Sequence, residues 1–422
     1  MQKRSGFKKV YLCFFGRKLN SFVFRLSSFV FRLSSFAILS FFCNGCGRIW
    51  GGITWYYPPT KITRIIVGGD LTSYNSAPEY SVARLNTDGS LDASFNPVGT
   101  GLNARVRALA IDSSGKIIVG GDFTTYNVTS EPSIARLNTD GSLDATFGST
   151  GAGLSSLVKA LVIDSSGKVI VAGTFVNYNG TPEHSVARLN TDGSLDVTFN
   201  PGAALNSWVN AVAIDSSGKI IVGGDFTDYN VTSEIYIARL NTDGSLDATF
   251  NPVGGGLAND VYALTIDSSG KIVVVGDFIS YNGTPEPGVA RLNTDGSLDA
   301  TFNPTAGVGL NSWVNALAID SSGKIIVGGH FTSYNITPEF YVARLNTDGS
   351  LDTTFNPTGT GLNGDVYAVA LDSSGKIIVS GFFTSYNTTP EFYIARLNTD
   401  GSLDTTFNPT GTGLSNGVRG EH

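Results

Sequence analysis

The sequence predicts an all-β fold in which one structural unit is repeated seven times. The decapeptide ARLNTDGSLD occurs seven times without a change, first at residues 83–92. A second motif, DSSGK, occurs six times at spacings of 51 to 53 residues, and no segment has the periodicity of a helix. Four short strands per unit at this period are typical of a propeller blade. We therefore expect a seven-bladed β-propeller of four-stranded antiparallel blades with a period of about 52 residues.

The second unit shows where each strand is expected. Residues 106–111 (VRALAI) form the first strand, and the turn DSSG joins it to the second strand at 116–123 (KIIVGGDF). A loop at 124–132 leads to the third strand at 133–138 (SIARLN), and the turn TDG leads to the fourth strand at 142–147 (SLDATF). Asp and Asn accept local backbone hydrogen bonds and Gly adopts positive φ, so both turns suit antiparallel hairpins. A parallel β-helix fits less well, because its coils repeat after only about 20–30 residues.

Side chains that recur in every unit are expected to be structural. One phenylalanine ends each fourth strand and one tyrosine precedes an asparagine in each unit, and burial of such a ring contributes about 1.5–3 kcal/mol. The repeated arginine, first seen at Arg84, is expected to pair with a recurrent acid such as Asp92. The phenylalanines expected between blades are Phe95, Phe147, Phe199, Phe250, Phe302, Phe355 and Phe407, and the tyrosines are Tyr74, Tyr126, Tyr178, Tyr229, Tyr281, Tyr334 and Tyr386.

The first unit lacks a recognisable first strand. Residues 53–57 (ITWYY) could supply it, or the chain could close the ring with the residues around Val418. We favour residues 53–57, because the C-terminal piece ends before its apolar part.

The N-terminal residues 1–45 are typical of an export signal. They contain eight basic residues and no acid, and residues 36–42 form a short apolar stretch. The following FFCNGC resembles a bacterial lipobox, so we expect Cys46 to be lipidated and to anchor the protein at the cell surface. Ordinary cleavage and secretion is the alternative. Residues 46–60 are then a linker or closing strand, and 61–422 are a single propeller domain.

Charge and cysteine content limit the function further. Residues 46–422 carry 20 basic and 35 acidic residues, and a body this acidic repels nucleic acid. All three cysteines lie at or before Cys46, so the body forms no disulfides. We expect a monomer that meets the membrane only through its lipid anchor and needs no cofactor.

No motif indicates catalysis or a metal site. Asn86, Asp88 and Asp92 surround Gly89 in the NTDGSLD turn, but this loop lacks the further acids of a calcium site, so we interpret it as a hairpin turn. Histidine occurs only at three positions, and no nucleophile–base pattern accompanies it. We therefore predict no catalytic residues and no metal. The acids that share a position after the second strands (Asp70, Asp122, Asp225 and Asp277) are interrupted by Thr174, His330 and Phe382, which indicates a polar strand end.

The units differ from one another mainly on one face. The DSSG and TDG turns lie on the same face, and the remaining connections lie on the opposite face, where the sequence varies. An aromatic and charged rim around a channel suits recognition of a protein or carbohydrate ligand. The candidate ligand-binding residues are Arg105, Arg107, Lys159, Trp208, Asn210, Asp260, Tyr262, Trp313, Asn315, Asp365 and Tyr367. Neutral drift of exposed loops, a structural spacer, and a lyase or hydrolase with a polar site at the channel mouth are the alternatives.

The repeats also resemble a known family. ARLNTDGSLD followed by TF and by IDSSGKIIVGG is similar to the delta-60 repeat, and the likeness covers about residues 61–422. This resemblance implies a β-propeller of bacterial exported proteins without an assigned activity, and it supplies no catalytic residues. The DSSGKIIV turn also resembles the NHL repeat of other propellers.

Overall fold

The computed structural model describes residues 64–95, 99–148, 153–202, 205–230, 232–250, 256–302, 309–355, 360–407 and 413–415, and the backbone of 53–56. The chain divides into the units 1–37 and 38–422, and every described residue belongs to the second. All regular elements in these ranges are β-strands. Among them there is no helix long and apolar enough to cross a membrane. The expected export segment and Cys46 lie outside the described residues.

Blade 2 shows the architecture of each repeat. Strands β6 (Val106–Ile111), β7 (Ile117–Gly121) and β10 (Ile134–Leu137) form an antiparallel sheet in the order β6-β7-β10. A fourth antiparallel segment follows, in which Leu143 forms a bridge to Leu137. This segment is much shorter than the strand expected at 142–147, because the carboxylate of Asp144 accepts a hydrogen bond from the backbone of Thr146 and the chain turns there. The four-stranded antiparallel blade is thus confirmed, with its fourth strand reduced to one bridge.

The segment expected as a loop at 124–132 is a small hairpin. Strands β8 (Thr125–Tyr126) and β9 (Thr129–Ser130) pair with each other, and Asn127 between them has a φ of 52°. The Asn127 side-chain oxygen also accepts a hydrogen bond from the backbone N–H of Gly101. Asparagine tolerates the left-handed conformation that this turn requires, which explains the repeated YN motif. We call each such hairpin the ribbon of its blade.

The other six blades repeat this arrangement of one sheet and one ribbon. Blade 1 contains β1 (Ile53–Tyr56), β2 (Arg64–Gly68), β3 (Ser73–Tyr74), β4 (Ala77–Pro78) and β5 (Val82–Leu85). Blade 3 contains β11 (Val158–Ile163), β12 (Val169–Gly173), β13 (Asn177–Tyr178), β14 (Thr181–Pro182) and β15 (Val186–Leu189). Blade 4 contains β16 (Val209–Ile214), β17 (Ile220–Gly224), β18 (Asp228–Tyr229), β19 (Thr232–Ser233) and β20 (Ile237–Leu240).

The last three blades complete the chain. Blade 5 contains β21 (Val261–Ile266), β22 (Ile272–Gly276), β23 (Ser280–Tyr281), β24 (Thr284–Pro285) and β25 (Val289–Leu292). Blade 6 contains β26 (Val314–Ile319), β27 (Ile325–Gly329), β28 (Ser333–Tyr334), β29 (Thr337–Pro338) and β30 (Val342–Leu345). Blade 7 contains β31 (Asp365–Leu371), β32 (Ile377–Phe382), β33 (Ser385–Tyr386), β34 (Thr389–Pro390) and β35 (Ile394–Leu397).

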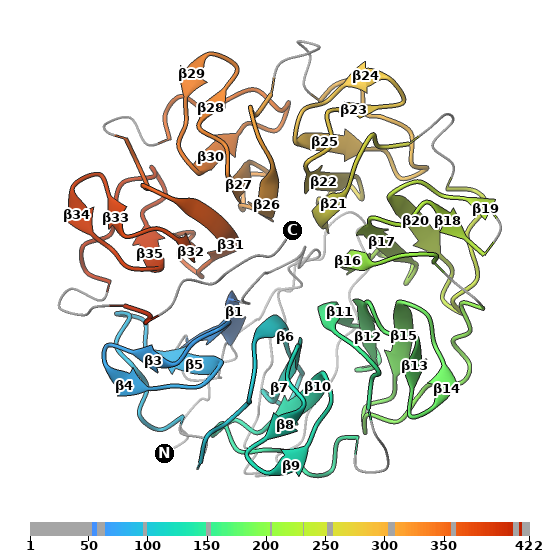
Figure 1. Cartoon of the computed structure of the whole chain (residues 1–422). Helices are drawn as coiled ribbons and strands as arrows, with labels where there is room; N and C mark the ends of the chain where they lie inside the picture. Colours follow the sequence, from blue (N-terminus) through green and yellow to red (C-terminus); the bar gives the residue numbers. More distant parts are fainter. Residues whose placement is uncertain are drawn as a thin grey trace, which may run out of the picture. The chain divides into compact units, whose positions relative to one another are not determined.

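The blades form a closed ring, with their first strands innermost (Figure 1). Each first strand contacts the first strand of the next blade, and β31 of blade 7 contacts β1 of blade 1. Strand β1 pairs with β2, so it occupies the place expected for residues 53–57. The C-terminal segment also contributes: Leu414 forms a bridge to Tyr74 of the first ribbon, as Leu102 does to Tyr126 in blade 2. Both ends of the propeller sequence therefore join blade 7 to blade 1.

The hydrophobic core lies between neighbouring blades. One cluster joins Ile66, Val82 and Phe95 of blade 1 to Val106 and Val119 of blade 2, and each other pair of neighbours shares a similar cluster. A Cβ atom on Gly141, which has a φ of 88°, would lie only 3.2 Å from the Phe95 ring. The prediction that the repeated phenylalanines fill the space between blades is confirmed.

The repeated arginine fastens each blade to the next. In blade 2, Arg136 donates from Nε to Asp144 over 2.7 Å and from a terminal nitrogen to the Thr191 carbonyl of blade 3 over 2.6 Å. Its guanidinium lies 4.8 Å from the centroid of the Phe147 ring, and Lys116 donates to the same aspartate. We call this arrangement the blade latch. It recurs in blades 2–7, and in blade 1 Arg64 takes the place of the lysine. Arg396 closes the ring by donating to Thr87 of blade 1.

Candidate functional site

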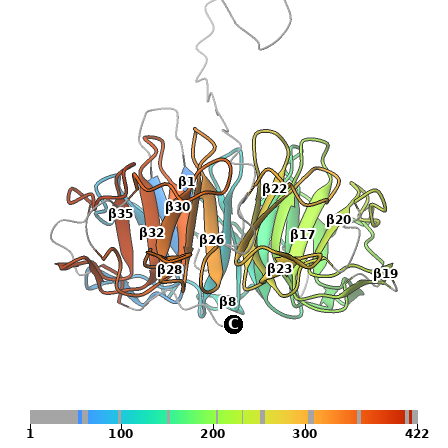
Figure 2. The same cartoon turned by 90° about the horizontal axis from the view of Figure 1, so that it is seen from above.

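The propeller has one invariant face and one variable face. Antiparallel pairing places the start of each first strand and the end of each second strand together, as with Val106 and Gly121, while the DSSG and TDG turns lie at the other end. The ribbons lie along the lower side of the propeller in Figure 2, on the variable face. All candidate ligand-binding residues belong to this face, because they occur at the start of the first strands.

Six of the eleven candidate residues lie in β-bulges. In blades 2–7 the pairing of the first and second strands shifts by one residue at the second or third position of the first strand. A bulge redirects the side chain of the extra residue, and here these side chains are buried, with exposed fractions from 3% for Asn210 to 9% for Tyr367. The bulge residues are Arg107, Lys159, Asn210, Tyr262, Asn315 and Tyr367. They line the inner strands and are not an open rim.

Several bulge residues already have structural partners. Asn210 donates to the Val261 carbonyl of blade 5 over 3.2 Å, and Asn315 donates to the Val366 carbonyl of blade 7 over 3.1 Å. Arg107 forms a two-point ion pair with Asp122 of its own blade. The two asparagines therefore tie adjacent blades together, a role that the sequence analysis did not assign to them.

Blades 2 and 3 form a basic side of the variable face. The Lys159 ammonium donates to Asn210 over 3.1 Å and lies 4.1 Å from the centroid of the Trp208 ring, which is 48% exposed. Arg105 lies at the start of the first strand of blade 2. Its Nε and one terminal nitrogen are buried and have no hydrogen-bond partner in the described ranges. This guanidinium is the least satisfied cation of the face.

Blades 4 and 5 form an acidic side. Asp225 and Asp277 each have one buried carboxylate oxygen without a hydrogen-bond partner among the residues that the structure describes. Burial raises the pKa of Asp277, although a hydrogen bond from Tyr262 opposes this effect. Burial also raises the pKa of Tyr236, and the charges of Asp260, Asp225 and Asp277 raise it further. Each of the three carboxylates therefore lies close enough to the Tyr236 hydroxyl to act on it electrostatically.

Blades 6 and 7 meet at a histidine–aspartate pair. The Nδ1 atom of His330 lies 2.6 Å from a carboxylate oxygen of Asp365, and the Tyr367 hydroxyl donates to the other oxygen over 3.3 Å. The His330 ring also packs against the rings of Trp313 and Tyr341, at centroid distances of 5.4 and 6.4 Å. Its side chain is 49% exposed. The sequence shows that His330 interrupts a polar position, but it does not reveal the partner in the next blade.

Three tyrosines on the variable face have a strained backbone. Tyr236, Tyr341 and Tyr393 have φ values of 65° to 66°, and the equivalent positions in the other blades hold serine or glycine. A bulky residue in this conformation costs on the order of 1 kcal/mol or more. In blade 7, Tyr393 also lies between two exposed aromatic side chains, Phe382 and Phe392. The same φ occurs at the equivalent Ser81, Ser133 and Ser185, so this conformation is a feature of the repeated backbone.

A recurrent glutamate was missed by the sequence analysis. One glutamate precedes the third strand in every blade, and burial raises the pKa of Glu131 to about 7. The signal in the sequence was its repetition directly after each ribbon. The equivalent residues are Glu79, Glu131, Glu183, Glu234, Glu286, Glu339 and Glu391.

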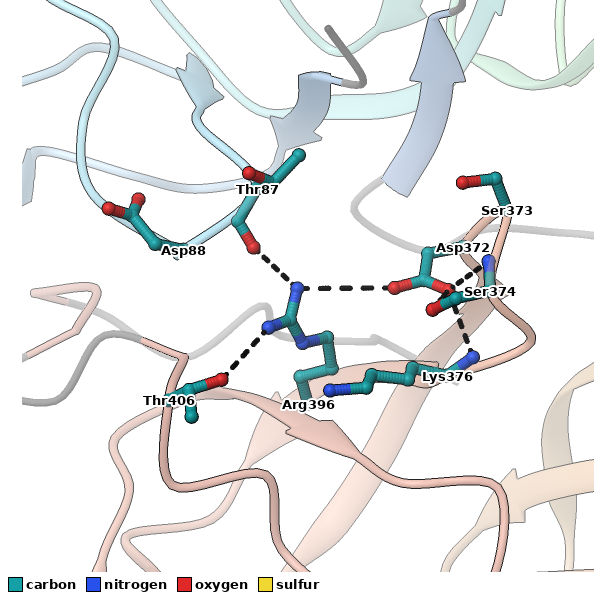
Figure 3. Close-up of a pocket in the computed structure, with 8 residues that line it drawn as sticks. All are labelled: Thr87, Asp88, Asp372, Ser373, Ser374, Lys376, Arg396 and Thr406. Atoms are coloured by element: carbon teal, nitrogen blue, oxygen red, sulfur yellow. Dashed lines mark hydrogen bonds and ion pairs between the residues drawn. The ribbon is translucent and has the colours of Figure 1, made fainter. Parts of the chain in front are cut away.

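The invariant face has a cavity of about 400 Å³ where blade 7 meets blade 1. Figure 3 shows that Arg396 occupies its centre and contacts Thr87, Asp372 and Thr406. Arg396 and Thr87 belong to the blade latch that joins blade 7 to blade 1, so the cavity is part of the ring closure. In the NTDGSLD turn, Asp88 accepts hydrogen bonds from the backbone and hydroxyl of Ser90, as a hairpin turn requires. The described residues contain no cluster of three or more His, Cys, Asp or Glu arranged for a metal ion.

Solved structures similar to this chain have low identity to it. The WD40 β-propeller domain of Doa1 is 16% identical, with a TM-score of 0.48, over 75% of this chain and 85% of that one. A gluconolactonase from Xanthomonas campestris is 15% identical, with a TM-score of 0.35, over 63% and 78% of the two chains. A protein of unknown function from Bacteroides caccae is 15% identical, with a TM-score of 0.36, over 68% and 91%. With every TM-score below 0.5, none of them carries an argument about activity. No curated protein matches the sequence.

The repeats themselves match one protein family. The matched segments are residues 64–95, 113–147, 165–199, 216–250, 268–302, 321–355 and 373–407, one in each blade. Each segment contains the second strand, the ribbon, the third strand and the blade latch, which are the parts that all blades share. The first strands of blades 2–7, where the candidate residues lie, fall between the matched segments. The chain belongs to the family described as "Domain of unknown function (DUF5122) beta-propeller", which is the delta-60 repeat type.

Proposed function

We propose that this protein is a non-catalytic, exported β-propeller that binds a peptide or glycan ligand on its variable face. The observation that carries the proposal is the set of exposed aromatic side chains on that face, in which Trp208, Phe382 and Phe392 are 37% to 49% exposed. Aromatic side chains give a ligand a large contact area at low entropic cost. A ligand that covers these rings would explain why aromatic residues occur there.

The contrast between the two faces supports the proposal. On the invariant face every blade carries the same latch, so side chains there are determined by packing against the next blade. On the variable face the residues equivalent to Arg105 are Leu157, Trp208, Asp260, Trp313 and Asp365, which share neither size nor charge. The backbone at this position has the same positive φ in all seven blades, so only the tyrosine side chains distinguish blades 4, 6 and 7 from the blades with serine or glycine.

Export and membrane attachment belong to the same proposal. The basic and apolar pattern of residues 1–45 and the motif before Cys46 support an exported protein that is held at the cell surface by a lipid on Cys46. Mass spectrometry of the native N-terminal peptide tests this part. A mature chain that begins at a diacylated Cys46 is expected, and an unmodified Cys46 within a longer mature chain would contradict it.

Binding is tested with the full chain on glycan and peptide arrays. We expect Trp208→Ala combined with Trp313→Ala to abolish the array signal and to leave the cooperative unfolding transition in place, because Trp208 is half exposed. The matched control is Val128→Ala combined with Ile336→Ala, which removes two apolar side chains that are each 97% exposed at the tips of ribbons. Array signals that survive in the tryptophan variant would show that the ligand binds elsewhere.

An enzyme is the second candidate, and the His330–Asp365 pair favours it. A carboxylate that holds Nδ1 of a histidine leaves Nε2 able to accept a proton, as a general base in a lyase or hydrolase must. The test is turnover of a panel of esters, lactones and uronate-containing glycans by the full chain. Turnover that is lost in His330→Gln and kept in His184→Gln would establish the enzyme, and absence of turnover across the panel would reject it.

A further inference from the structure

The aromatic side chains of the variable face gather in three consecutive blades. Each blade has three variable positions here: the residue that ends or follows the second strand, and the two residues that precede the third strand. In blades 2–5 these positions hold a single aromatic residue among Phe, Tyr and Trp, which is Tyr236. In blades 6, 7 and 1, which are neighbours in the closed ring (Figure 1), they hold Tyr80, Phe340, Tyr341, Phe382, Phe392 and Tyr393.

Contacts between blades 6 and 7 join these residues into one surface. The His330 ring of blade 6 packs against the rings of Trp313 and Tyr341, and its Nδ1 atom lies 2.6 Å from Asp365 of blade 7. Asp365 lies directly opposite Phe382 in the pairing of β31 with β32. Residues that face each other in an antiparallel pair point to the same side of the sheet, so the Phe382 ring lies beside the His330–Asp365 pair.

This surface continues across blade 7 and is open to solvent. The centroid of the Tyr393 ring lies 6.0 Å from that of Phe382 and 6.4 Å from that of Phe392. Phe382 is 49% exposed and Phe392 is 37% exposed, and the side chains of His330 and Asp365 are 49% and 23% exposed. A ligand from outside can therefore reach both the rings and the polar pair. We call this set of residues the aromatic sector: Trp313, His330, Tyr341, Asp365, Phe382, Phe392 and Tyr393.

The aromatic sector offers the two kinds of contact that a sugar needs. The C–H faces of a pyranose ring are apolar and stack on aromatic rings, while the hydroxyl groups at its edge need hydrogen-bond partners. One Asp365 oxygen contacts His330 and the other accepts from the Tyr367 hydroxyl, and a carboxylate has about four lone-pair sites, so Asp365 can accept from sugar hydroxyls as well. With Nδ1 of His330 on Asp365, the Nε2 atom of this exposed ring can also contact a hydroxyl group.

Three observations disfavour other classes of ligand. The Tyr393 ring is inclined by 37° to Phe382 and by 58° to Phe392, so one flat ligand, such as a nucleobase, cannot stack on all three. A stable protein partner covers about 20–30 residues on each side, far more than the aromatic sector contains. Residues 46–422 carry 20 basic and 35 acidic residues, so an acidic glycan would be repelled. A neutral sugar chain meets none of these objections.

We propose that the aromatic sector binds a neutral oligosaccharide with equatorial hydroxyl groups, whose sugar rings stack on the aromatic rings of blade 7 and whose hydroxyl groups contact the His330–Asp365 pair. This inference rests on the proposed binding function and names its ligand class and its place on the variable face. Equatorial hydroxyl groups leave both faces of a sugar ring apolar, so aromatic rings at different inclinations can contact it. Tyr80 of blade 1 is equivalent to Phe392 and is 40% exposed, so it extends the surface for a longer chain.

The test is calorimetric titration of the full chain with cellohexaose, a neutral chain of β-1,4-linked glucose. The repeats supply substitutions that the fold already contains: Phe382→Thr and Tyr393→Ser introduce the residues that blade 3 has at the same positions, Thr174 and Ser185. We expect each single variant to raise Kd about fivefold, through loss of one stacked ring, and the double variant to raise it about 25-fold. Thermal unfolding followed by circular dichroism shows that each variant is folded.

The matched control is Val176→Thr combined with Ile279→Thr. These two side chains are 53% and 70% exposed beside the ribbons of blades 3 and 5, and the other five blades have threonine at this position. We expect the control variant to bind cellohexaose with unchanged Kd. A hexamer of β-1,4-linked glucuronate has the same ring shape with a carboxylate on every sugar, and it should bind at least about tenfold more weakly than cellohexaose.

The inference is overturned if cellohexaose does not bind, or if the control variant weakens binding as much as the Phe382 and Tyr393 variants do. If cellohexaose does not bind while the arrays find another ligand that depends on Trp208 and Trp313, the ligand class is wrong and the binding function stands. If nothing binds to the variable face, both are wrong.

Discussion

The blade latch makes a quantitative prediction about Asp144. This carboxylate is almost fully buried and accepts hydrogen bonds from Lys116, Arg136 and Thr146. Burial alone would raise the pKa of Asp144, but the hydrogen bonds from Lys116, Thr146 and Arg136 outweigh this effect and hold the pKa well below its usual value. The charged form is therefore the form that the fold stabilises, and Asp144→Asn removes that charge while it keeps the size of the side chain.

The expected loss follows from the burial of the two ion pairs. Removing one partner of a buried pair costs about 3–5 kcal/mol, because the other charge is left unpaired. Lys116 is about one-third exposed and can return to water, and asparagine still offers one oxygen, so the lower end applies. We expect Asp144→Asn to lower the free energy of unfolding by about 3 kcal/mol, which is a large part of the roughly 5–15 kcal/mol typical of folded proteins.

The assay is unfolding in guanidinium chloride, followed by tryptophan fluorescence and circular dichroism. Asp140→Asn is the matched control. Asp140 is an exposed residue of the adjacent TDG turn that accepts hydrogen bonds from the backbone and hydroxyl of Ser142, a role that asparagine can fill. We expect the control to stay within about 0.5 kcal/mol of the wild type. The reasoning is refuted if Asp144→Asn is no more destabilising than Asp140→Asn.

Three further predictions concern stability. In six blades, burial raises the pKa of the glutamate equivalent to Glu131 to about 7, against 4.5 in the unfolded chain. The folded state therefore holds protons that the unfolded state releases, so Tm should fall as the pH rises from 5 to 7. A calorimetric Tm that does not change over this pH range would contradict the prediction. Arg105→Met should raise the free energy of unfolding by about 1 kcal/mol in denaturant titrations, because it removes unsatisfied buried donors, and an unchanged or lower value would show that the guanidinium is satisfied. A chain that ends at Phe407 should melt at a lower temperature in scanning calorimetry than the full chain, because it lacks the bridge from Leu414 to Tyr74; equal melting would show that this contact does not stabilise the ring.

The repetition in the sequence was sufficient to predict the fold because packing between blades is local and identical. A ring of equal interfaces requires the same phenylalanine and arginine in every unit, and the pairing of Arg84 with Asp92 could be anticipated from their fixed spacing. The fourth strand was predicted too long because SLDATF has the composition of a strand, whereas Asp144 caps a turn within it. The ribbon was missed because two-residue strands have no detectable periodicity.

The candidate site could be predicted only as a face. The candidate residues lie on the variable face, as the order of the strands predicts, but the β-bulge that buries Arg107 and Asn210 has no signature in the sequence. The pairing of His330 with Asp365 joins residues that are 35 positions apart and lie in different blades. Only one unit has a histidine at this repeat position, so the repetition could not reveal the pair. The unpartnered atoms of Arg105 and Asp277 depend on what their neighbours contact, and only coordinates show this.

The central claim is that the ring leaves one face free to vary and that this face binds the ligand. Hydrogen–deuterium exchange of the full chain, with and without the peptide or glycan that the arrays select, tests this most directly. We expect ligand protection at the starts of the first strands, in peptides that cover residues 208–210, 313–315 and 365–367, and unchanged exchange in the TDG turns at 139–141 and 191–193. Protection of the TDG turns, or equal protection on both faces, would contradict the account.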